Sequence, residues 1–425
     1  LDKEGDPPQR LILTKEDMDG AKVRDMLETA TASGMTLARL PRLTEFKSGP
    51  VDATQIRPVA IEDLLGRPQR PLDRDAMAGL IKNKRVVVTG AGGSIGSELV
   101  RQISDFGPLQ LVLVDSSEFN LYSIDMEMLN RHPDLERKAV ICDVRDGPAI
   151  SRLFNDCNPE IVFHAAALKH VPLVEDNPCE GVLTNVIGTA NVANASVQAG
   201  ADAMVMISTD KAVNPTNVMG ASKRIAERYC QAQDLKRGES DGTRFVTVRF
   251  GNVLGSTGSV VPLFQKQLAA GGPLTVTDAE MKRYFMTIRE AVELILQASA
   301  MGDEAHERDG KIFVLDMGDP VLIMDLAEQM IRLAGMVPGE DIQIKITGLR
   351  PGEKLFEEMF HGGEPLVETE RDGILLAAPR AAEAETIARA VENLAEAAHS
   401  SDLDRVMTLI GDLVPEYRPS NDNQV

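Results

Sequence analysis

The stretch "RVVVTGAGGSIGSELV", residues 85–100, runs from a short β-branched segment through a glycine-rich turn into the start of a helix. Glycine at such a turn lets the backbone approach a pyrophosphate, whose charge then faces free amides and the positive end of the helix dipole. The stretch therefore predicts a dinucleotide-binding turn. Its expected contact residues are Gly90, Gly93, Ser94, Ile95 and Gly96.

Further apolar runs follow this stretch at regular spacing, with helical patterns between them. They are "QLVLVD" (110–115), "KAVICDV" (138–144), "EIVFHAA" (160–166), "AMVMIST" (203–209) and "RFVTVRFG" (244–251). Near-continuous β-branched runs separated by helices are typical of a parallel sheet covered on both faces. We therefore predict an α/β fold, a Rossmann-type doubly wound parallel sheet with a smaller interleaved substrate-binding region. Ligands of such sheets bind beyond the carboxyl ends of the strands.

The second and third predicted strands provide the adenosine end of the site. Asp115 closes the second strand, 19 residues after Gly96, where a carboxylate can accept hydrogen bonds from the ribose. No Lys or Arg follows it in "DSSEFN", and a carboxylate repels a 2′-phosphate, so the sequence favours NAD over NADP. Asp143 and Val144 close the third strand and are expected to bracket the adenine. For Asp143, an ordinary loop aspartate is the alternative.

The fourth predicted strand ends in small residues, "HAAALKHV". Ala165 and Ala166, with the next alanine, would let a cofactor lie flat against the backbone. Lys169 and His170 would then face whatever lies beside the cofactor. For His170 alone, we favour a structural role.

Composition limits the class of protein. A length of 425 residues allows two or three domains, or one large α/β domain with appendages. A net charge of −20 argues against broad nucleic-acid binding, so an anionic ligand needs a local cationic pocket. The longest apolar runs are shorter than a bilayer span. The four cysteines and six histidines show no metal-ligand spacing, so we expect reduced thiols and no metal site.

The organisation along the chain is uneven. The N-terminal segment contains strand, helix and strand patterns, and it opens without a signal-peptide pattern, so we expect a fragment of a longer protein. The predicted parts are the tail of an incomplete α/β domain (1–50), a linker (51–81), a dinucleotide-binding domain (82–375) with interleaved substrate-binding segments (about 251–300 and 320–370), and C-terminal helices (376–425).

Three motifs carry a family resemblance. They are "STDKAVNPTNVMGASK" (208–223), "RFGNVLGSTGSVVP" (249–262) and "RPGEKLFEE" (350–358). Together they resemble the bacterial polysaccharide-biosynthesis nucleotide-sugar 4,6-dehydratases of the CapD type, in the extended short-chain dehydrogenase/reductase family, over about residues 60 to 375. The resemblance implies a UDP-N-acetylglucosamine-like substrate, a tightly held NAD, and a role in making capsule or lipopolysaccharide. Longer members carry an N-terminal membrane region.

The resemblance also implies catalytic roles. Oxidation of the hexose at C4 acidifies the C5 proton, after which a base removes that proton and an acid protonates the departing C6 hydroxyl. Thr209 would bond the C4 hydroxyl, Asp210 would protonate the leaving hydroxyl and Lys211 would take the C5 proton. Lys211 acts as a base only when neutral, which requires a depressed pKa. Lys223 would bind the nicotinamide ribose and supply positive charge.

Met219 is the departure from the wider family. Many nicotinamide enzymes keep a Tyr and a Lys four residues apart on this helical face, and here the pair is Met219 and Lys223. Methionine carries no proton and cannot replace a phenol. We therefore hypothesise that ionised Asp210 takes the C4 hydroxyl proton during oxidation and later delivers it to the C6 hydroxyl.

The remaining motif residues are expected to hold the nucleotide sugar. Asn252 would donate to a phosphate and Val261 would lie near the base. Arg283 and Arg350 would bind the diphosphate, where planar bidentate donors fit best, and Glu353 would hold the uridine ribose. This set would form the cationic pocket that the acidic chain otherwise lacks.

Two alternatives remain open from the sequence. One is a nucleotide-sugar 4-epimerase, against which the Asp-Lys pair and the missing tyrosine both count. The other is a catalytically silent NAD-binding protein that acts by interaction. We expect a homo-oligomer with no nucleic-acid partner, a cytoplasmic location for this fragment, and a parent protein anchored in the inner membrane.

Overall fold

The computed structural model describes residues 9–15, 18, 20–40, 57–65, 70–237, 242–301, 310–360, 366–378 and 383–419. Parts of the predicted N-terminal unit (1–8, 41–50), of the predicted linker (51–56, 66–69) and of the later segments (361–365, 379–382) lie outside these ranges. The chain divides into two compact units. Unit 1 is Leu1–Gln69, Leu254–Thr287 and Gly318–Leu349, and unit 2 is Arg70–Val253, Ile288–Met317 and Arg350–Val425.

Unit 2 is built on a nine-stranded sheet with the order β17-β18-β14-β9-β8-β7-β4-β5-β6. Its strands are β4 (Arg85–Thr89), β5 (Gln110–Asp115), β6 (Arg137–Ile141), β7 (Ile161–His164), β8 (Ala203–Ile207), β9 (Arg244–Arg249), β14 (Ile312–Leu315), β17 (Leu366–Glu368) and β18 (Ile374–Ala377). The strands from β6 to β14 pair in parallel, and β17 and β18 add an antiparallel edge. The predicted doubly wound Rossmann-type fold is confirmed.

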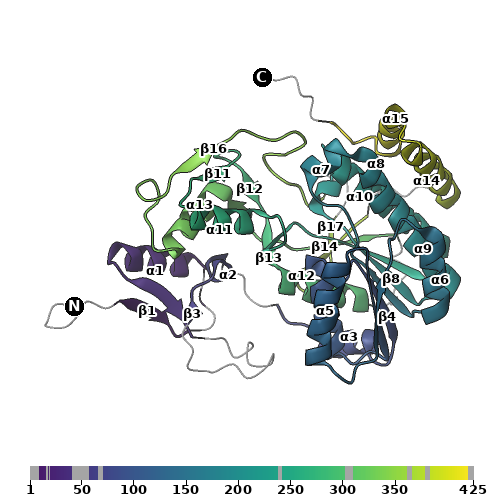
Figure 1. The fold of residues 1–425 in the computed structure, drawn as a ribbon, viewed down its shortest axis with the longest axis horizontal. Helices are drawn as coiled ribbons and strands as arrows, with labels where there is room; N and C mark the ends of the chain where they lie inside the picture. Colours follow the sequence, from purple (N-terminus) through teal and green to yellow (C-terminus); the bar gives the residue numbers. More distant parts are fainter. Residues whose placement is uncertain are drawn as a thin grey trace. The chain divides into compact units, whose positions relative to one another are not determined.

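Helices cover both faces of this sheet (Figure 1). One layer contains α3 (Arg74–Ile81), α4 (Ser94–Asp105), α5 (Glu118–Arg131) and α12 (Ile288–Ala300), and the other contains α6 (Gly147–Cys157), α9 (Gly188–Ala199) and α10 (Val218–Arg237). Since both faces are covered, β7 and β8 are buried along their whole length. The C-terminal helices α14 (Ala384–His399) and α15 (Leu403–Leu413) pack against α10.

The strand order reverses between β4 and β7, which lie side by side although β5 and β6 follow β4 in the chain. The carboxyl ends of these two strands therefore open a crevice where α/β proteins of this class bind their ligands. Short helices α7 (Val171–Asp176) and α8 (Pro178–Val182) and a π-helix, η2 (Leu183–Ile187), follow β7. This arrangement places the predicted glycine turn and the predicted alanines at one edge.

Unit 1 has a three-stranded sheet of β1 (Arg10–Leu13), β2 (Thr36–Arg39) and β3 (Arg57–Pro58). Helices α1 (Gly20–Ala32) and α2 (Ile61–Leu65) pack with α13 (Ile323–Leu333), and the buried Arg39 side chain donates to Asp63. The unit also contains α11 (Val260–Ala269), β11 (Leu274–Val276), β12 (Lys282–Arg283), β13 (Phe285–Thr287), β15 (Val321–Leu322) and β16 (Ile344–Ile346). Residues 61–65 and 74–81 of the predicted linker are thus helical.

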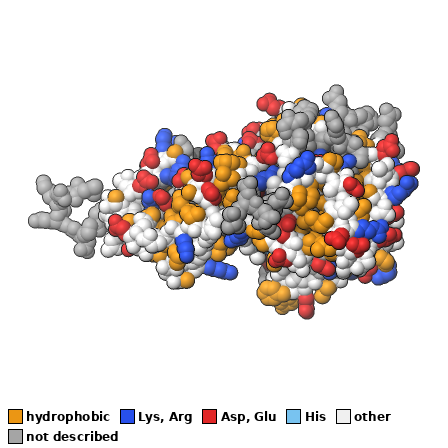
Figure 2. All heavy atoms as spheres, turned by 90° about the horizontal axis from the view of Figure 1, so that it is seen from above, with side chains coloured by type: hydrophobic (Ala, Val, Ile, Leu, Met, Phe, Trp, Pro, Cys, Tyr) orange, Lys and Arg blue, Asp and Glu red, His pale blue; other side chains and the backbone are white. Residues whose placement is uncertain are grey.

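The surface carries both signs of charge. Figure 2 shows acidic and basic side chains interspersed over the face that it draws. No helix among the described residues is long and apolar enough to span a bilayer. Cys142, Cys157, Cys179 and Cys230 are free thiols, and within the described ranges no cluster of His, Cys, Asp or Glu could hold a metal ion.

A buried histidine closes β7. His164 Nδ1 lies 2.7 Å from Thr89 Oγ1 and Nε2 lies 3.0 Å from Thr189 Oγ1. The Thr189 hydroxyl donates its single hydrogen to the Asn185 carbonyl at 2.7 Å, so Nε2 must carry the proton that bonds Thr189. Burial, followed by the charge of Lys223, lowers the pKa of His164 from 6.5 to about 3. His164 is therefore neutral in the folded protein.

This pKa predicts an acid-sensitive step. Between pH 6.5 and about 3 the unfolded chain binds a proton at His164 that the folded chain does not bind. Stability is therefore lost as the pH falls through this window, by about 1.4 kcal/mol per pH unit for this group. Replacing His164 by Gln removes the titration but also disturbs the hydrogen bonds, at a cost of about 1–3 kcal/mol at neutral pH.

We expect the gap in thermal midpoint between wild type and His164→Gln, followed by circular dichroism, to narrow on acidification. His399→Gln, on an exposed position of α14, is the control and should follow the wild type at every pH. A gap for His164→Gln that is constant with pH would contradict the assignment of this group.

Candidate active site

The glycine turn between β4 and α4 has no space for a side chain at Gly90 or Gly96. Gly90 has φ +66°, and a Cβ on it would lie 2.6 Å from the amide nitrogen of Ala166. A Cβ on Gly96 would lie 1.9 Å from the carbonyl oxygen of Gly90. Gly93 is the N-cap of α4, so the following residues, Ser94 and Ile95, form its first turn. The turn is a backbone cradle at the helix N-terminus, and this shape fits a dinucleotide pyrophosphate.

Asp115 ties this cradle to the end of β5. Its Oδ2 accepts from the Gly92 amide at 2.9 Å and its Oδ1 accepts from the Ser117 amide at 2.8 Å. Each carboxylate oxygen keeps acceptor capacity beyond one hydrogen bond. Asp115 can therefore hold the turn and also meet the predicted ribose hydroxyls.

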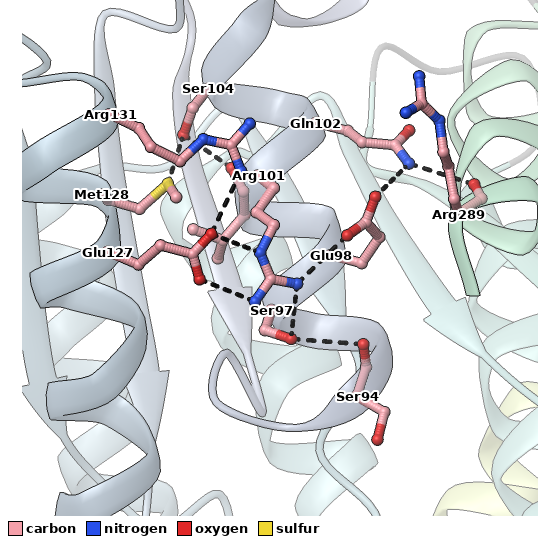
Figure 3. Close-up of polar contacts among 11 residues, drawn as sticks. Ser94, Ser97, Glu98, Arg101, Gln102, Ser104, Glu127, Met128, Arg131 and Arg289 are labelled. Atoms are coloured by element: carbon pink, nitrogen blue, oxygen red, sulfur yellow. Dashed lines mark hydrogen bonds and ion pairs between the residues drawn. The ribbon is translucent and has the colours of Figure 1, made fainter. Parts of the chain in front are cut away.

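An ion network joins α4 to the neighbouring helix α5 (Figure 3). Arg101 Nε and Nη2 each lie 2.8 Å from an oxygen of Glu127 on α5, and Nη1 lies 3.2 Å from Glu98. The hydrogen bond from Arg101, followed by the opposing effect of burial, leaves the pKa of Glu127 lowered. Such a bidentate pair is more geometrically demanding than a single ion pair, so it orients the helix whose N-terminus faces the crevice.

The other predicted nucleotide residues lie at the neighbouring strand ends. Asp143 accepts from Arg145 Nε at 2.8 Å and from the Arg145 amide at 2.9 Å, and these bonds lower its pKa. Val144 is buried. Ala165 donates its amide to the Thr89 carbonyl at 3.0 Å. The Asp143 carboxylate is thus engaged within its own loop, and adenine contacts remain a prediction for this pair.

Lys169 and His170 follow the alanines. Burial, and then the charge of Lys211, lowers the pKa of Lys169. Burial, and then the charge of Lys169, lowers the pKa of His170, which is the N-cap residue of α7. Asn185, in the π-helix η2, clamps the preceding backbone: it accepts from the Leu168 amide at 2.8 Å and donates to the Leu168 carbonyl at 2.9 Å. Sequence reasoning missed Asn185 because a π-bulge has no pattern in apolar spacing.

The turn after β8 holds the predicted catalytic residues. Asp210 begins a short 3-10 helix, η3 (Asp210–Ala212), and is fully buried. Its Oδ1 accepts from Thr209 Oγ1 at 2.9 Å and from Lys211 Nζ at 3.0 Å. Its Oδ2 is buried with no hydrogen-bond partner among the described residues. A buried carboxylate oxygen without a donor is unfavourable, so a donor from a ligand would stabilise it.

Lys211 is shared among several acceptors. Its Nζ lies 3.3 Å from Asn252 Oδ1, at the start of β10 (Asn252–Leu254), and 3.5 Å from Glu357 Oε1. The structure therefore brings together Thr209, Asp210, Lys211 and Asn252, and it adds Glu357 to them. Glu357 was not predicted, because a contact between residues so far apart in the chain leaves no local signal.

Helix α10 packs against this turn. A Cβ on Gly220 would lie 2.1 Å from the Lys211 carbonyl oxygen, so the helix packs directly on η3. Met219 is buried in the hydrophobic core. Lys223 is also buried, its Nζ donates to the Ile207 carbonyl at 2.6 Å, and burial lowers its pKa to about 8. An ammonium has three donors, so this bond leaves Lys223 able to meet a ribose.

A second buried network lies beside Lys223. Arg249 Nε and Nη2 donate to the two oxygens of Glu227 at 2.7 Å each, and Ser208 Oγ donates to Glu227 at 2.7 Å. Because Ser208 directly precedes Thr209, this network fixes the end of β8. The sequence around Glu227 does not indicate this role, because its partner Arg249 lies on another element.

The remaining predicted residues divide between the units. Arg350 and Glu353 are in unit 2, where they form a turn through a 3.0 Å bond from the Glu353 amide to the Arg350 carbonyl. Val261, on α11, and Arg283, on β12, are buried in unit 1. Their proposed contacts with a nucleotide sugar stay predictions.

Comparison with known proteins gives the family. The family described as "Polysaccharide biosynthesis protein" matches residues 86–379. The chain is 45% identical over 357 residues to the capsular polysaccharide biosynthesis protein CapD of Staphylococcus aureus, covering 84% of this chain and 58% of that protein. The chain thus spans little more than half the length of this relative.

Two further relatives carry different activities in their names. A UDP-glucose 4-epimerase of Rickettsia rickettsii is 33% identical, over 66% of this chain and 79% of that protein. A UDP-N-acetylglucosamine 4,6-dehydratase (inverting) of Campylobacter jejuni is 32% identical, over 66% of this chain and 78% of that protein.

The cradle predicts a sharp requirement for glycine. Gly96→Ala places a methyl group 1.9 Å from the Gly90 carbonyl oxygen, so the turn must lose the backbone shape that fits a pyrophosphate. We expect NAD affinity, measured by calorimetric titration, to fall by at least about tenfold, equivalent to about 1.4 kcal/mol.

The matched control is Gly411→Ala, in the helix α15, where a Cβ meets nothing within 4 Å. This change should leave NAD affinity unaltered and stabilise the protein by about 0.5–1 kcal/mol, because alanine is the better helix former. Unchanged affinity in Gly96→Ala would mean that the cradle is not the pyrophosphate site.

The fold, the motifs and the match over residues 86–379 together show that this chain belongs to the polysaccharide biosynthesis protein family, within the extended short-chain dehydrogenase/reductases.

Proposed function

We propose that this chain catalyses the NAD-dependent 4,6-dehydration of a UDP-N-acetylhexosamine, most directly UDP-N-acetylglucosamine, to a 4-keto-6-deoxy sugar nucleotide for surface polysaccharide synthesis. The observation that carries the proposal is the ion pair between the buried Asp210 and the half-buried Lys211 at the carboxyl end of β8. One acid and one base beside each other are what elimination of water requires beyond oxidation.

The cofactor would lie in the glycine cradle of residues 90–96. When bound there, NAD would supply the hydride acceptor for oxidation at C4 and the hydride donor for C6. Gly90 packs directly against Ala166, so the turn presents bare backbone at this point. Lys223 would supply positive charge near the nicotinamide ribose. No Lys or Arg stands beside Asp115 in residues 116–120, in keeping with NAD rather than NADP.

Asp210 is the proposed carrier of the hydroxyl proton. Thr209 and Lys211 both donate to its Oδ1, which leaves Oδ2 for the substrate. It would take the C4 hydroxyl proton during oxidation and give the same proton to the C6 hydroxyl, which leaves as water. Lys211, as the amine, would take the C5 proton. The phenol that Met219 replaces is not needed in this scheme.

The 4-epimerase alternative predicts a different product, because epimerisation inverts C4 without loss of water. Relatives with both names align to this chain, so the product decides. With UDP-N-acetylglucosamine and NAD in deuterated water, we expect NMR to show a 4-keto-6-deoxy sugar with deuterium at C5. A C4-inverted hexose would establish the epimerase, and no turnover would favour a binding protein.

Two substitutions separate the proposed roles. Asp210→Asn should lower C4 oxidation by at least about 100-fold, because an amide cannot accept the hydroxyl proton. Lys211→Ala should still oxidise C4, seen as reduced-cofactor absorbance, but stall before elimination. Asp202→Asn, at the opposite and exposed end of β8, is the control and should keep activity within about twofold. Undiminished oxidation by Asp210→Asn would refute the carboxylate as acceptor.

A further inference from the structure

Glu357 is a second carboxylate at the proposed catalytic lysine. Its side chain is 4% exposed, and Oε1 lies 3.5 Å from Lys211 Nζ. Lys211 Nζ therefore lies near two carboxylates, Asp210 at 3.0 Å and Glu357. In the motif "RPGEKLFEE", Arg350 and Glu353 have predicted roles in nucleotide binding, and Glu357 has none.

The segment that carries Glu357 is fastened to the catalytic turn. The Gly352 carbonyl accepts from Thr216 Oγ1 at 3.0 Å and from Asn217 Nδ2 at 2.9 Å. Lys354 Nζ donates to the Val213 carbonyl at 3.0 Å, and Asn214 Nδ2 donates to Glu358 at 3.0 Å. One backbone carbonyl and two side chains thus attach the segment to the catalytic turn before and after Glu357. The position of the Glu357 carboxylate near Lys211 is therefore set by the fold, because Glu357 is not a mobile surface side chain.

The charges around Lys211 oppose its proposed task. Asp210 and Glu357 face Lys211 as carboxylates. Lys169 faces Lys211 from the segment after β7, and the charge of Lys211 helps to lower the pKa of Lys169. His170 is next to Lys169 in sequence. On the fastened segment, Lys354 and Glu358 pair with each other at 3.3 Å. Two adjacent carboxylates favour the ammonium form of Lys211, yet removal of the C5 proton needs the amine.

We propose that Glu357 is a further catalytic residue, the proton acceptor that converts Lys211 from ammonium to amine before the C5 proton is removed. This inference rests on the proposed function. In the step, the N–H bond of the Lys211 ammonium breaks and an O–H bond forms on Glu357, so an ion pair becomes an amine and a carboxylic acid with no change in total charge. The amine then takes the C5 proton.

Asp210 cannot serve in this step. Once it has accepted the C4 hydroxyl proton it is a neutral acid, and it must keep that proton for the C6 hydroxyl. Glu357 is then the remaining carboxylate that forms an ion pair with Lys211 among the described residues. The loss of negative charge at Asp210 also weakens the hold on the ammonium, which makes transfer to Glu357 easier at that moment.

The test is the pH profile of elimination in the 425-residue chain with NAD and UDP-N-acetylglucosamine. In the wild type, the proton moves within the pair, so the rate should be nearly flat from about pH 6 to about pH 7.5, below the pKa of about 8 of Lys223. In Glu357→Gln, the lysine proton must leave to solvent. We expect elimination about 100-fold slower at neutral pH and rising about tenfold per pH unit, with C4 oxidation retained within about threefold.

Glu358→Gln is the matched control, since it removes the negative charge of the neighbouring glutamate and keeps a side-chain oxygen that can accept from Asn214 and Lys354. It should leave a flat profile and a rate within about threefold of the wild type. Glu357→Asp keeps a carboxylate, so it should be slower but flat, and it also serves if Glu357→Gln folds poorly.

Three outcomes overturn the inference. They are a flat profile in Glu357→Gln, a profile in Glu357→Asp as steep as that of Glu357→Gln, and equal losses of oxidation and elimination at every pH, which mark mere structural support. If the wild type forms no dehydrated product, the proposed function fails and this inference falls with it. If the wild type dehydrates normally and only the Glu357 profiles disagree, the function stands and Glu357 is not the acceptor.

Discussion

Close backbone contact at the carboxyl edge of the sheet is the constraint on which the rest of the structure depends. The glycine turn touches both the start of α4 and the end of β7, at Gly96 and Gly90 respectively. At the other side of the same edge, Gly220 brings α10 against the carbonyl of Lys211. Because a side chain at any of these three glycines would force backbone atoms apart, the proposed cofactor cradle and the catalytic turn are held by one rigid core.

Buried charges then fix the end of β8 from behind. The bidentate pair of Arg249 with Glu227 is desolvated, and such a pair is tolerated only when its remaining donors and acceptors are satisfied. Ser208 completes it, and Lys223 bonds the Ile207 carbonyl next in the chain. Met219 is buried in the apolar core, so α10 supports the site at a position where a tyrosine would accept the hydroxyl proton. In the proposed mechanism, proton transfer therefore takes place at the strand end and not on the helix.

The sequence predicted those features that depend on neighbours in the chain. Alternating apolar runs indicated the parallel strands, and the spacing of glycines indicated the turn, because both patterns are local consequences of backbone geometry. It did not indicate β14, β17 and β18, which are short and extend the sheet from late segments. His164, Asn185 and Glu357 were missed for a related reason. Each acts through partners distant in sequence, and a single buried polar residue looks the same in sequence whether or not its partners exist.

The buried lysine shows how the site and the stability of the fold are linked. Burial lowers the pKa of Lys223 from 10.5 to about 8, so between these values the unfolded chain binds a proton that the folded chain releases. Stability rises with pH through that window, by about 1.4 kcal/mol per pH unit for this group, and below it the folded protein bears the full cost of a buried ammonium. A ligand that places acceptors or negative charge beside this ammonium offsets that cost. In the proposed complex, the group that weakens the free protein would thus stabilise the bound state. It would provide locally the positive charge that a chain of net charge −20 lacks as a whole.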